Sequence, residues 1–335
     1  MRTRLKIITA LTAATMLGLT GCSGPGTGND AGAAGSSGGS GDDGTFTVAA
    51  FTAGYATPGG KLTLDKFVEE GKAKGWDVTL YTSDFDYDSI NSDMQSAITQ
   101  GADVILAGFP DPRQIAPLVN AAESADIPIF SIDGGVEPNE DFVEDVTFDQ
   151  DQLASLTVGA LEEAMGGLEG KDVMVIGHDP HIGIMTRSNL AYDMLEEKGA
   201  NIAGGEMKQA LNPGTSQEEA LKFVTDFLQA NPDGLDGVWV GWDHAALGAA
   251  QAINEAGRDD IYVTGVDALG VAVEEIKKDG PFYASVHQDW FSVVDVVVED
   301  IEAYRADGTL PEENFVEVEG ELIDRNNAAD FTPSM

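Results

Sequence analysis

The chain has 335 residues, of which 42% are apolar, 58 are acidic and 18 are basic, giving a formal net charge of −40. This acidity excludes nucleic acid as a partner, because binding phosphates requires a basic face, and it argues against adhesion to anionic lipid headgroups without a covalent tether. The apolar content is sufficient for a proper core, and the length exceeds what one core usually supports, so two domains are expected.

The first residues have the pattern of a bacterial export signal. Three basic residues within the first six precede an apolar run at residues 7–19, which is shorter than the roughly 20 residues of a membrane-spanning helix. Leu19-Thr20-Gly21-Cys22 resembles the lipobox of bacterial lipoproteins. That resemblance implies that residues 1–21 are a signal peptide and that Cys22, the single cysteine, carries a lipid. We therefore expect the protein outside the cytoplasm, anchored to the membrane through Cys22. An ordinary signal with a stray cysteine is the alternative.

Residues 22–44 are rich in glycine, serine and alanine and cannot bury apolar surface. They are predicted to form a flexible tether after the lipidated cysteine. From residue 45 the pattern changes, and short apolar runs alternate with amphipathic stretches. Strands are predicted at residues 46–51, 76–81, 104–107 and 127–131. Helices are predicted at residues 61–74, at a segment that Ser89 caps, and at residues 113–124.

The alternation repeats after residue 149. Strands are predicted at residues 173–176, near 201–207, and at 238–240, 261–266 and 284–286. Helices are predicted at residues 152–165, 187–198, after the capping box Thr215–Glu218, and at 245–256, 271–278 and 291–304. Continuous apolar strands that alternate with helices indicate an α/β fold with two doubly wound parallel sheets.

Polar and aromatic side chains follow most of the predicted strands. In open parallel sheets, ligands lie beyond the carboxyl ends of the strands. Carboxylates there can accept hydrogen bonds from hydroxyl groups, an arginine can donate to oxygens, and aromatic faces can cover the C–H patches of a sugar. The set predicts a site for a polyhydroxyl ligand, although such residues singly often cap helices or stabilise turns.

The chain resembles the periplasmic sugar-binding proteins of the ribose- and galactose-binding type, the substrate-binding subunits of ABC importers. The similarity is carried by residues 101–106, 125–133, 243–249 and 263–267. It implies the type I periplasmic binding protein fold, with two lobes joined by a hinge that the chain crosses three times. The first lobe would contain residues 45–148 and 289–313, and the second residues 149–288 and 314–335. The crossings would lie near residues 149–150, near Gln288 and at residues 312–315.

The resemblance also implies a ligand site between the lobes. Asp133 and Asp267 match aspartates that accept from sugar hydroxyls, and Arg187 matches an arginine at a helix start. His181 matches a histidine of the galactose-binding branch, and Gln288 a polar residue near the hinge. The whole predicted site is Tyr55, Thr57, Phe109, Asp133, His181, Arg187, Trp242, Asp243, Asp267 and Gln288.

Three departures leave the identity of the sugar open. Trp242-Asp243 stands where many members have Asn-Asp, Gly134 replaces an arginine of the ribose binders, and Gly59-Gly60 replaces residues that are often aromatic. Tyr55 or Trp242 is expected to supply the missing ring. The function implied is binding of a monosaccharide or polyol by a monomer that closes around it and then docks on an ABC permease.

The sequence also contains residues that two other classes of function would use. His178-Asp179-Pro180-His181 could form half of a metal site, but nothing reads as a closed ligand set, and neither a metal nor a cofactor is expected. Asp133 and Asp267 could act as acid and base in glycoside hydrolysis, yet the chain has no nucleophile elbow, phosphate loop or dinucleotide fingerprint, so an enzyme is not expected. A sensor that presents its ligand to a membrane receptor remains open.

Overall fold

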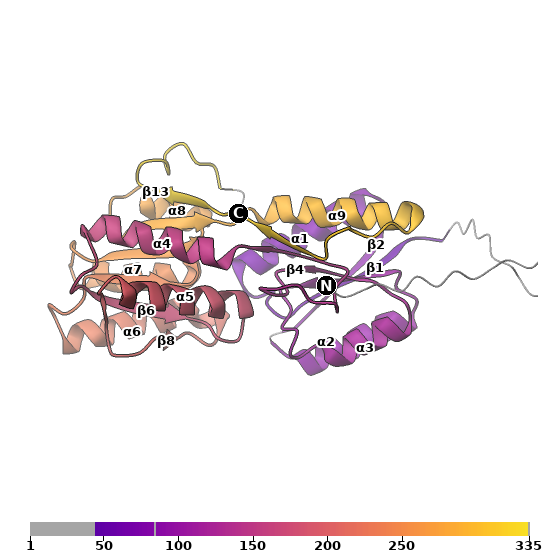
Figure 1. Ribbon diagram of the computed structural model, residues 1–335, viewed down its shortest axis with the longest axis horizontal. Helices are drawn as coiled ribbons and strands as arrows, with labels where there is room; N and C mark the ends of the chain where they lie inside the picture. Colours follow the sequence, from indigo (N-terminus) through magenta and orange to yellow (C-terminus); the bar gives the residue numbers. More distant parts are fainter. Residues whose placement is uncertain (1–43, 84, 334–335) are drawn as a thin grey trace, which may run out of the picture. The chain divides into compact units, whose positions relative to one another are not determined.

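The computed structural model describes residues 44–83 and 85–333 (Figure 1). The predicted signal peptide, Cys22 and the tether up to residue 43 lie outside this part. Residues from Gly44 onwards form one compact unit. Among the described residues, no helix has both the length and the apolar composition needed to cross a bilayer.

The first sheet has helices on both faces. Its strands, all parallel to their neighbours, are in spatial order β12 (Phe315–Val318), β5 (Glu144–Phe148), β4 (Ile129–Ile132), β3 (Val104–Gly108), β1 (Thr47–Thr52) and β2 (Asp77–Thr82). One face packs against α1 (Pro58–Ala73) and α9 (Trp290–Asp307), which lie side by side in Figure 1, and the other against α2 (Tyr87–Thr99) and α3 (Ala116–Ser124).

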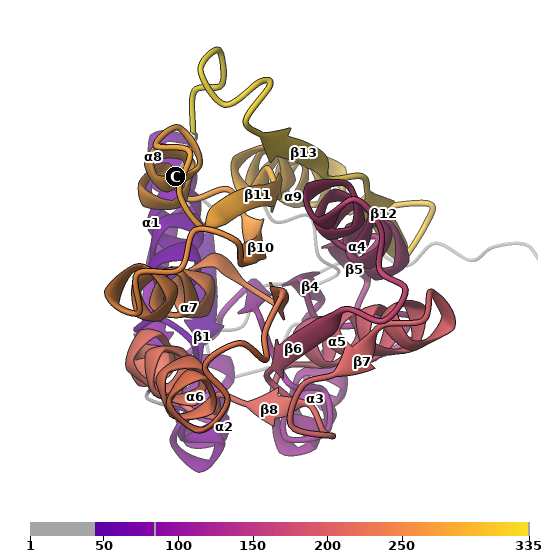
Figure 2. The ribbon, with the colours of Figure 1, turned by 90° about the vertical axis from the view of Figure 1, so that its left-hand side faces the viewer.

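The second sheet also has helices on both faces, and its neighbouring strands are parallel except at the edge, where β13 (Glu321–Asp324) is antiparallel to β11 (Phe282–His287). Its strands are in order β13, β11, β10 (Tyr262–Asp267), β9 (Gly237–Val240), β6 (Asp172–Gly177) and β7 (Asn201–Ile202), with β8 (Lys208–Gln209) also paired to β6. The helices on one face are α4 (Gln150–Met165) and α5 (Ile182–Glu197), and those on the other are α6 (Ser216–Ala230), α7 (Asp243–Glu255) and α8 (Gly270–Ile276) (Figure 2).

Successive side chains of a strand point to opposite faces of its sheet, so each sheet contributes to two hydrophobic cores. In β1, Val48 and Ala50 pack with α1 and α9, whereas Ala49 and Phe51 pack with α2 and α3. Strands that are buried on both faces are mostly apolar, which is why most of these runs were recognisable in the sequence. The predicted α/β fold with two doubly wound lobes is confirmed.

The hinge crossings are only partly as expected. The chain leaves the first sheet after β5 and enters α4 at Asp149, and it returns after β11 through Gln288 to α9, as predicted. The third crossing was placed wrongly at residues 312–315. Phe315 to Val318 form β12, which pairs in parallel with β5 of the first sheet, so the crossing falls at Glu319-Gly320. Residues 314–318 therefore belong to the first lobe, not the second.

The crossing segments are hydrogen-bonded to one another. Asp149 N donates to Val318 O at 3.0 Å, and Gly320 N donates to the side-chain oxygen of Gln152 at 2.8 Å. The Gln152 amide in turn donates to Gly320 O at 3.3 Å. The first and third crossings thus form one connected unit between the two sheets.

Candidate functional site

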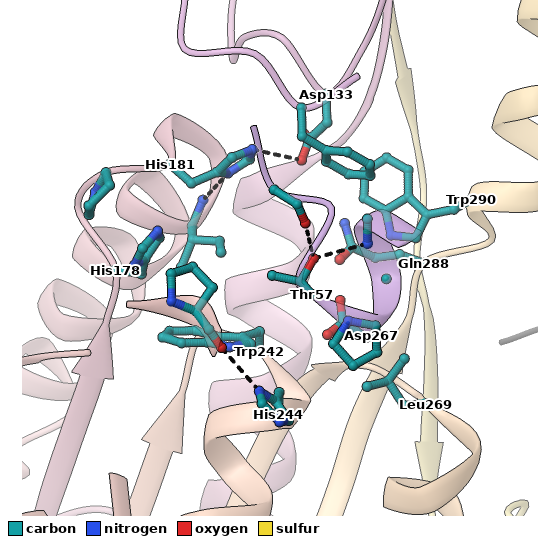
Figure 3. Close-up of a pocket in the computed structure, with 18 of the residues that line it drawn as sticks. Thr57, Asp133, His178, His181, Trp242, His244, Asp267, Leu269, Gln288 and Trp290 are labelled. Atoms are coloured by element: carbon teal, nitrogen blue, oxygen red, sulfur yellow. Dashed lines mark hydrogen bonds and ion pairs between the residues drawn. The ribbon is translucent and has the colours of Figure 1, made fainter. Parts of the chain in front are cut away.

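A cavity of about 110 Å³ lies beyond the carboxyl ends of strands from both sheets. The first lobe contributes Thr57, Phe109 and Asp133, which follow β1, β3 and β4. The second contributes side chains that follow β6, β9, β10 and β11, and these are His181, Arg187, Trp242, Asp267 and Gln288. Figure 3 shows that most of these side chains surround a common space. The structure thus brings together eight of the predicted site residues.

Backbone strain marks three of the strand ends. Phe109, Asp133 and Asp267 have positive φ angles of 53°, 57° and 121°, a region that non-glycine residues rarely adopt. Each of the three directly follows or ends a buried strand and each lines the pocket. Such conformations persist only where the surroundings hold them, and they are common at ligand sites.

Asp133 is held by contacts from both lobes. Its Oδ1 accepts a 2.6 Å hydrogen bond from Thr147 Oγ1 of β5, and its Oδ2 lies 3.4 Å from His181 Nε2 of the second lobe. His181 Nδ1 accepts from Ile184 N, which places the ring proton on Nε2, facing Asp133. Gly134 N donates to the buried Asp145, which fixes the loop after β4. The carboxylate is therefore positioned before any ligand arrives.

Arg187 is a buried cation on α5. Its Nε donates to Gly241 O and its Nη1 to Gln150 Oε1, both at 2.8 Å, and Gln150 in turn donates to Phe148 O. Burial lowers the pKa of Arg187, while the nearby carboxyls of Asp267 and Asp133 act in the opposite direction. A guanidinium remains charged under these conditions and has donors left for an oxygen in the pocket.

Asp267 Oδ2 accepts a 3.4 Å hydrogen bond from Asp243 N, but only Asp267 lines the pocket. Burial raises the pKa of Asp267 to about 7, against the opposing effect of the Arg187 charge. Asp243 lies behind it and is fully buried. Its Oδ1 accepts from Ser285 Oγ at 2.7 Å and its Oδ2 from Leu269 N at 2.9 Å. Burial, followed by the Asp267 charge, raises the pKa of Asp243 well above its usual range.

Aromatic rings from both lobes line the cavity. Trp242 packs at 5.6 Å, edge to face, on His178, and its indole Nε1 donates to Ser216 Oγ at 3.3 Å. Phe109 packs on Trp290, with ring centroids 5.0 Å apart. Trp242 and Trp290 are drawn on opposite sides of Thr57 in Figure 3. Rings placed in this way can cover apolar faces of a small ligand.

His178 adds a neutral acceptor. Its Nδ1 lies 2.8 Å from Ala210 O, so Nδ1 carries the proton and Nε2 is free to accept. Burial lowers the pKa of His178 to about 4, which keeps the ring uncharged near neutral pH. Within residues 44–83 and 85–333, no three His, Cys, Asp or Glu side chains gather in a way that could hold a metal ion.

Two predicted residues do not face the cavity. The Tyr55 hydroxyl donates to Asp65 Oδ1 at 2.6 Å, and Lys61 lies over the Tyr55 ring, so this side chain is bound to the outer part of α1. Asp243 supports the loop that carries Asp267 instead of lining the pocket. The sequence predicted that either Tyr55 or Trp242 provides an aromatic ring at the site. Of these two residues, Trp242 lines the cavity and Tyr55 does not.

Some lining residues were not among the predicted site residues. Trp290 begins α9 just beyond Gln288, and His178 and His244 follow strands, so their positions after strand ends were an available signal. Phe85 lies in the loop after β2, and Tyr87 is the first residue of α2. These two aromatic residues could not be assigned to the site from sequence, because they resemble ordinary core positions of a helix start.

Within the described residues, two buried polar atoms of the cavity wall make no hydrogen bond, namely His181 Nε2, which lies 3.4 Å from Asp133 Oδ2, and Gln288 Nε2. The Gln288 side chain is 1% exposed, and its Nε2 makes no hydrogen bond within the described part of the chain. Leaving such a donor unpaired costs about 1–3 kcal/mol. A ligand oxygen would satisfy it.

A model of the periplasmic binding protein domain matches residues 46–308. The D-apiose import binding protein of Paraburkholderia graminis is 26% identical over 283 residues, covering 84% of this chain and 88% of that protein. The ribose import binding protein of Bacillus subtilis is also 26% identical, over 68% of this chain and 71% of that protein.

Solved structures share the fold. An ABC transporter solute binding protein from Agrobacterium vitis, with bound allitol, has a TM-score of 0.76 at 21% identity and covers 85% of this chain and 97% of that one. A solute binding protein from Mycobacterium smegmatis, with bound glycerol, also has a TM-score of 0.76, at 24% identity over 87% of this chain and 98% of that one. By its family match over most of its length, the chain belongs to the periplasmic binding protein domain family.

Proposed function

We propose that this protein is the substrate-binding component of an ABC importer and that it binds one small, neutral sugar or polyol in the cavity between its two lobes. The observation that carries the proposal is the set of oriented polar groups and rings around one space. Gln288 Nε2 is an unpaired buried donor, Arg187 keeps donors free, and Asp133 and Asp267 are acceptors. Relatives named for apiose and ribose import support the same class of cargo.

The charge balance favours a neutral cargo. One buried guanidinium, Arg187, faces the carboxyls of Asp133 and Asp267, and burial raises the pKa of Asp267 to about 7. The charges of the pocket are thus nearly balanced without a ligand. An ionised cargo would leave an uncompensated charge in a buried site, which is costly. Hydroxyl groups, which both donate and accept, match the mixed set of groups present.

Binding would stabilise the closed arrangement of the lobes. Two contacts already join them at the cavity edge, from His181 to Asp133 and from Arg113 Nη2 to Pro180 O at 3.4 Å. A ligand that contacts both lobes binds the closed form better than the open form and shifts the population accordingly. The closed form is then the one that an ABC permease, or alternatively a receptor, would recognise.

We also propose that the protein acts as a monomeric lipoprotein outside the cytoplasm, with a lipid on Cys22 keeping it close to its permease. The proposal rests on the pattern of the first 22 residues, namely a basic start, a short apolar run and Leu-Thr-Gly-Cys. Replacing Cys22 with alanine should release the protein from the membrane fraction of the producing cells.

A thermal-shift screen tests the proposed cargo. The panel is D-apiose, D-ribose, D-allose, xylitol, allitol and myo-inositol, with glucuronate and glucosamine as charged controls. Stabilisation follows the ligand concentration relative to its Kd, so at least one neutral compound should raise the Tm with concentration while the charged controls do not. If only a charged compound raises the Tm, the proposed class is wrong. If the protein converts a bound sugar into a product, it is an enzyme.

A further inference from the structure

The beginning of α1 forms one wall of the cavity, and its residues have small side chains or none. Thr57, Pro58, Gly59 and Gly60 all line the pocket. Thr57 caps the helix by accepting from Gly60 N at 3.1 Å, and Pro58 occupies the first helical position. The local sequence thus fixes where the helix starts. It leaves two successive glycines at the cavity.

The two glycines differ in what the fold requires. A Cβ atom at Gly60 would lie 2.6 Å from Gly54 O and 2.8 Å from Thr57 Oγ1, so no side chain fits there. A Cβ atom at Gly59 would meet no described atom within 4 Å, and Gly59 is not among the glycines with positive φ. Neither packing nor backbone geometry therefore explains the glycine at position 59.

Glycine also weakens the helix in which it lies, because it loses more backbone freedom on folding than any other residue. An alanine or leucine at a position without strain or clash would stabilise the protein. Glycine at position 59 therefore lowers the stability of the folded protein, and no contact or backbone conformation of the fold requires it. Gly59 lines the cavity, and the space next to its Cα atom is open.

The ring of Trp242 lies on the second lobe and is held in place. The indole is 7% exposed, and Ser216 and His178 fix its orientation. Trp242 and Gly59 line the same cavity from different lobes. The second lobe thus contributes an apolar ring to the cavity, and the start of α1 leaves open space in the cavity wall.

We propose that Gly59 is a specificity-determining residue, and that part of the sugar or polyol occupies the space that a side chain at position 59 would fill. The proposal rests on the proposed function and adds to it the site of size selection. Cargo size is then set by α1 of the first lobe, while the polar groups set cargo chemistry.

The experiment measures affinity and stability of Gly59→Ala and Gly59→Leu, with Gly159→Leu as the matched control. Gly159 lies within α4, is exposed, and also leaves a Cβ atom without a neighbour within 4 Å. Calorimetric titration uses each member of the neutral panel that raises the Tm of the unchanged protein. Thermal unfolding without a sugar reports stability for each variant.

We expect Gly59→Leu to bind at least about tenfold more weakly, with Gly59→Ala in between, while the Tm of both without sugar is unchanged or higher. Gly159→Leu should raise the Tm and leave the affinity unchanged. Wild-type affinity in Gly59→Leu, or a fall in Tm that parallels the loss of binding, would overturn the inference. Lack of binding by the unchanged protein would instead count against the proposed function.

Discussion

Asp267 combines a strained backbone, partial burial and a carboxyl group that lines the cavity. Its φ is 121°, and its loop is held by Asp243 and Ser285 through Leu269 N and Ala268 N. The nearby Arg187 opposes the effect of burial on its pKa, which rises to about 7. At neutral pH this group is thus poised between its two protonation states.

Replacing Asp267 with asparagine should weaken sugar binding by at least about tenfold, since a hydroxyl loses its ionised acceptor. Binding favours the ionised form of Asp267, so wild-type affinity should rise from pH 6 to pH 8 as the carboxyl loses its proton, and the variant should lack this rise. Burial lowers the pKa of His178 to about 4, so this ring stays uncharged over this range, and burial also lowers the pKa of His181. Calorimetric titration at several pH values measures both effects, with Asp260→Asn as a surface control.

Glu144 is a second buried acid, in β5 and away from the cavity. Burial, with a further contribution from Asp300, raises its pKa from 4.5 to about 9. The native state therefore keeps a proton that the unfolded state releases, and the free energy of unfolding should fall as the pH rises from 7 to 9, by up to about 1.4 kcal/mol per pH unit. Urea unfolding of wild type and Glu144→Gln tests this. Equal pH slopes in the two proteins would contradict it.

Residue types and their places after strands led to a set of expected site residues, most of which line one cavity. Asp133, Arg187 and Gln288 follow from the chemistry of a hydroxylated ligand and from the resemblance, and all three line the cavity. Tyr55 and Asp243 could not be separated from them by sequence. Only the folded structure shows that Asp65 binds the Tyr55 hydroxyl and that Asp243 serves the backbone of its own lobe.

Among the elements, the strands that were missed have identifiable causes. β5 contains Glu144 and Asp145, which interrupt the apolar run although both are 1% exposed. The protonation of Glu144 and the hydrogen bond from Gly134 N to Asp145 make this burial tolerable. β12 has only four residues, Phe315–Val318, too few for a sequence pattern to distinguish it from a linker, and missing it moved the third hinge crossing to the wrong place.

The third crossing depends on a glycine. A Cβ atom at Gly320 would lie 2.6 Å from both Leu153 Cδ2 and Val286 Cγ1 and 3.1 Å from His287 O. Gly320→Ala should therefore force these neighbours apart and lower the free energy of unfolding by about 1–3 kcal/mol. Gly280→Ala is the matched control, because a Cβ atom there meets nothing within 4 Å. Coinciding urea unfolding curves for the two variants would show that the crossing is not tightly packed.

For the molecule as a whole, the periodic pattern of apolar runs was enough to predict two doubly wound lobes. The net charge of −40 argued against nucleic acid and anionic lipid headgroups as partners, but it gave no information about the fold. What the pattern could not provide is the hydrogen-bonded hinge or the detailed cavity wall, since both depend on contacts between residues far apart in the chain, such as Gln152 with Gly320.

A crystal structure of the protein grown with its best-binding neutral sugar tests the central claim most directly. We expect one sugar molecule in this cavity, with hydroxyl oxygens within hydrogen-bond distance of Arg187, Asp267 and Gln288 and a C–H face against Trp242. A sugar bound outside the cavity, or one that touches a single lobe, would contradict it.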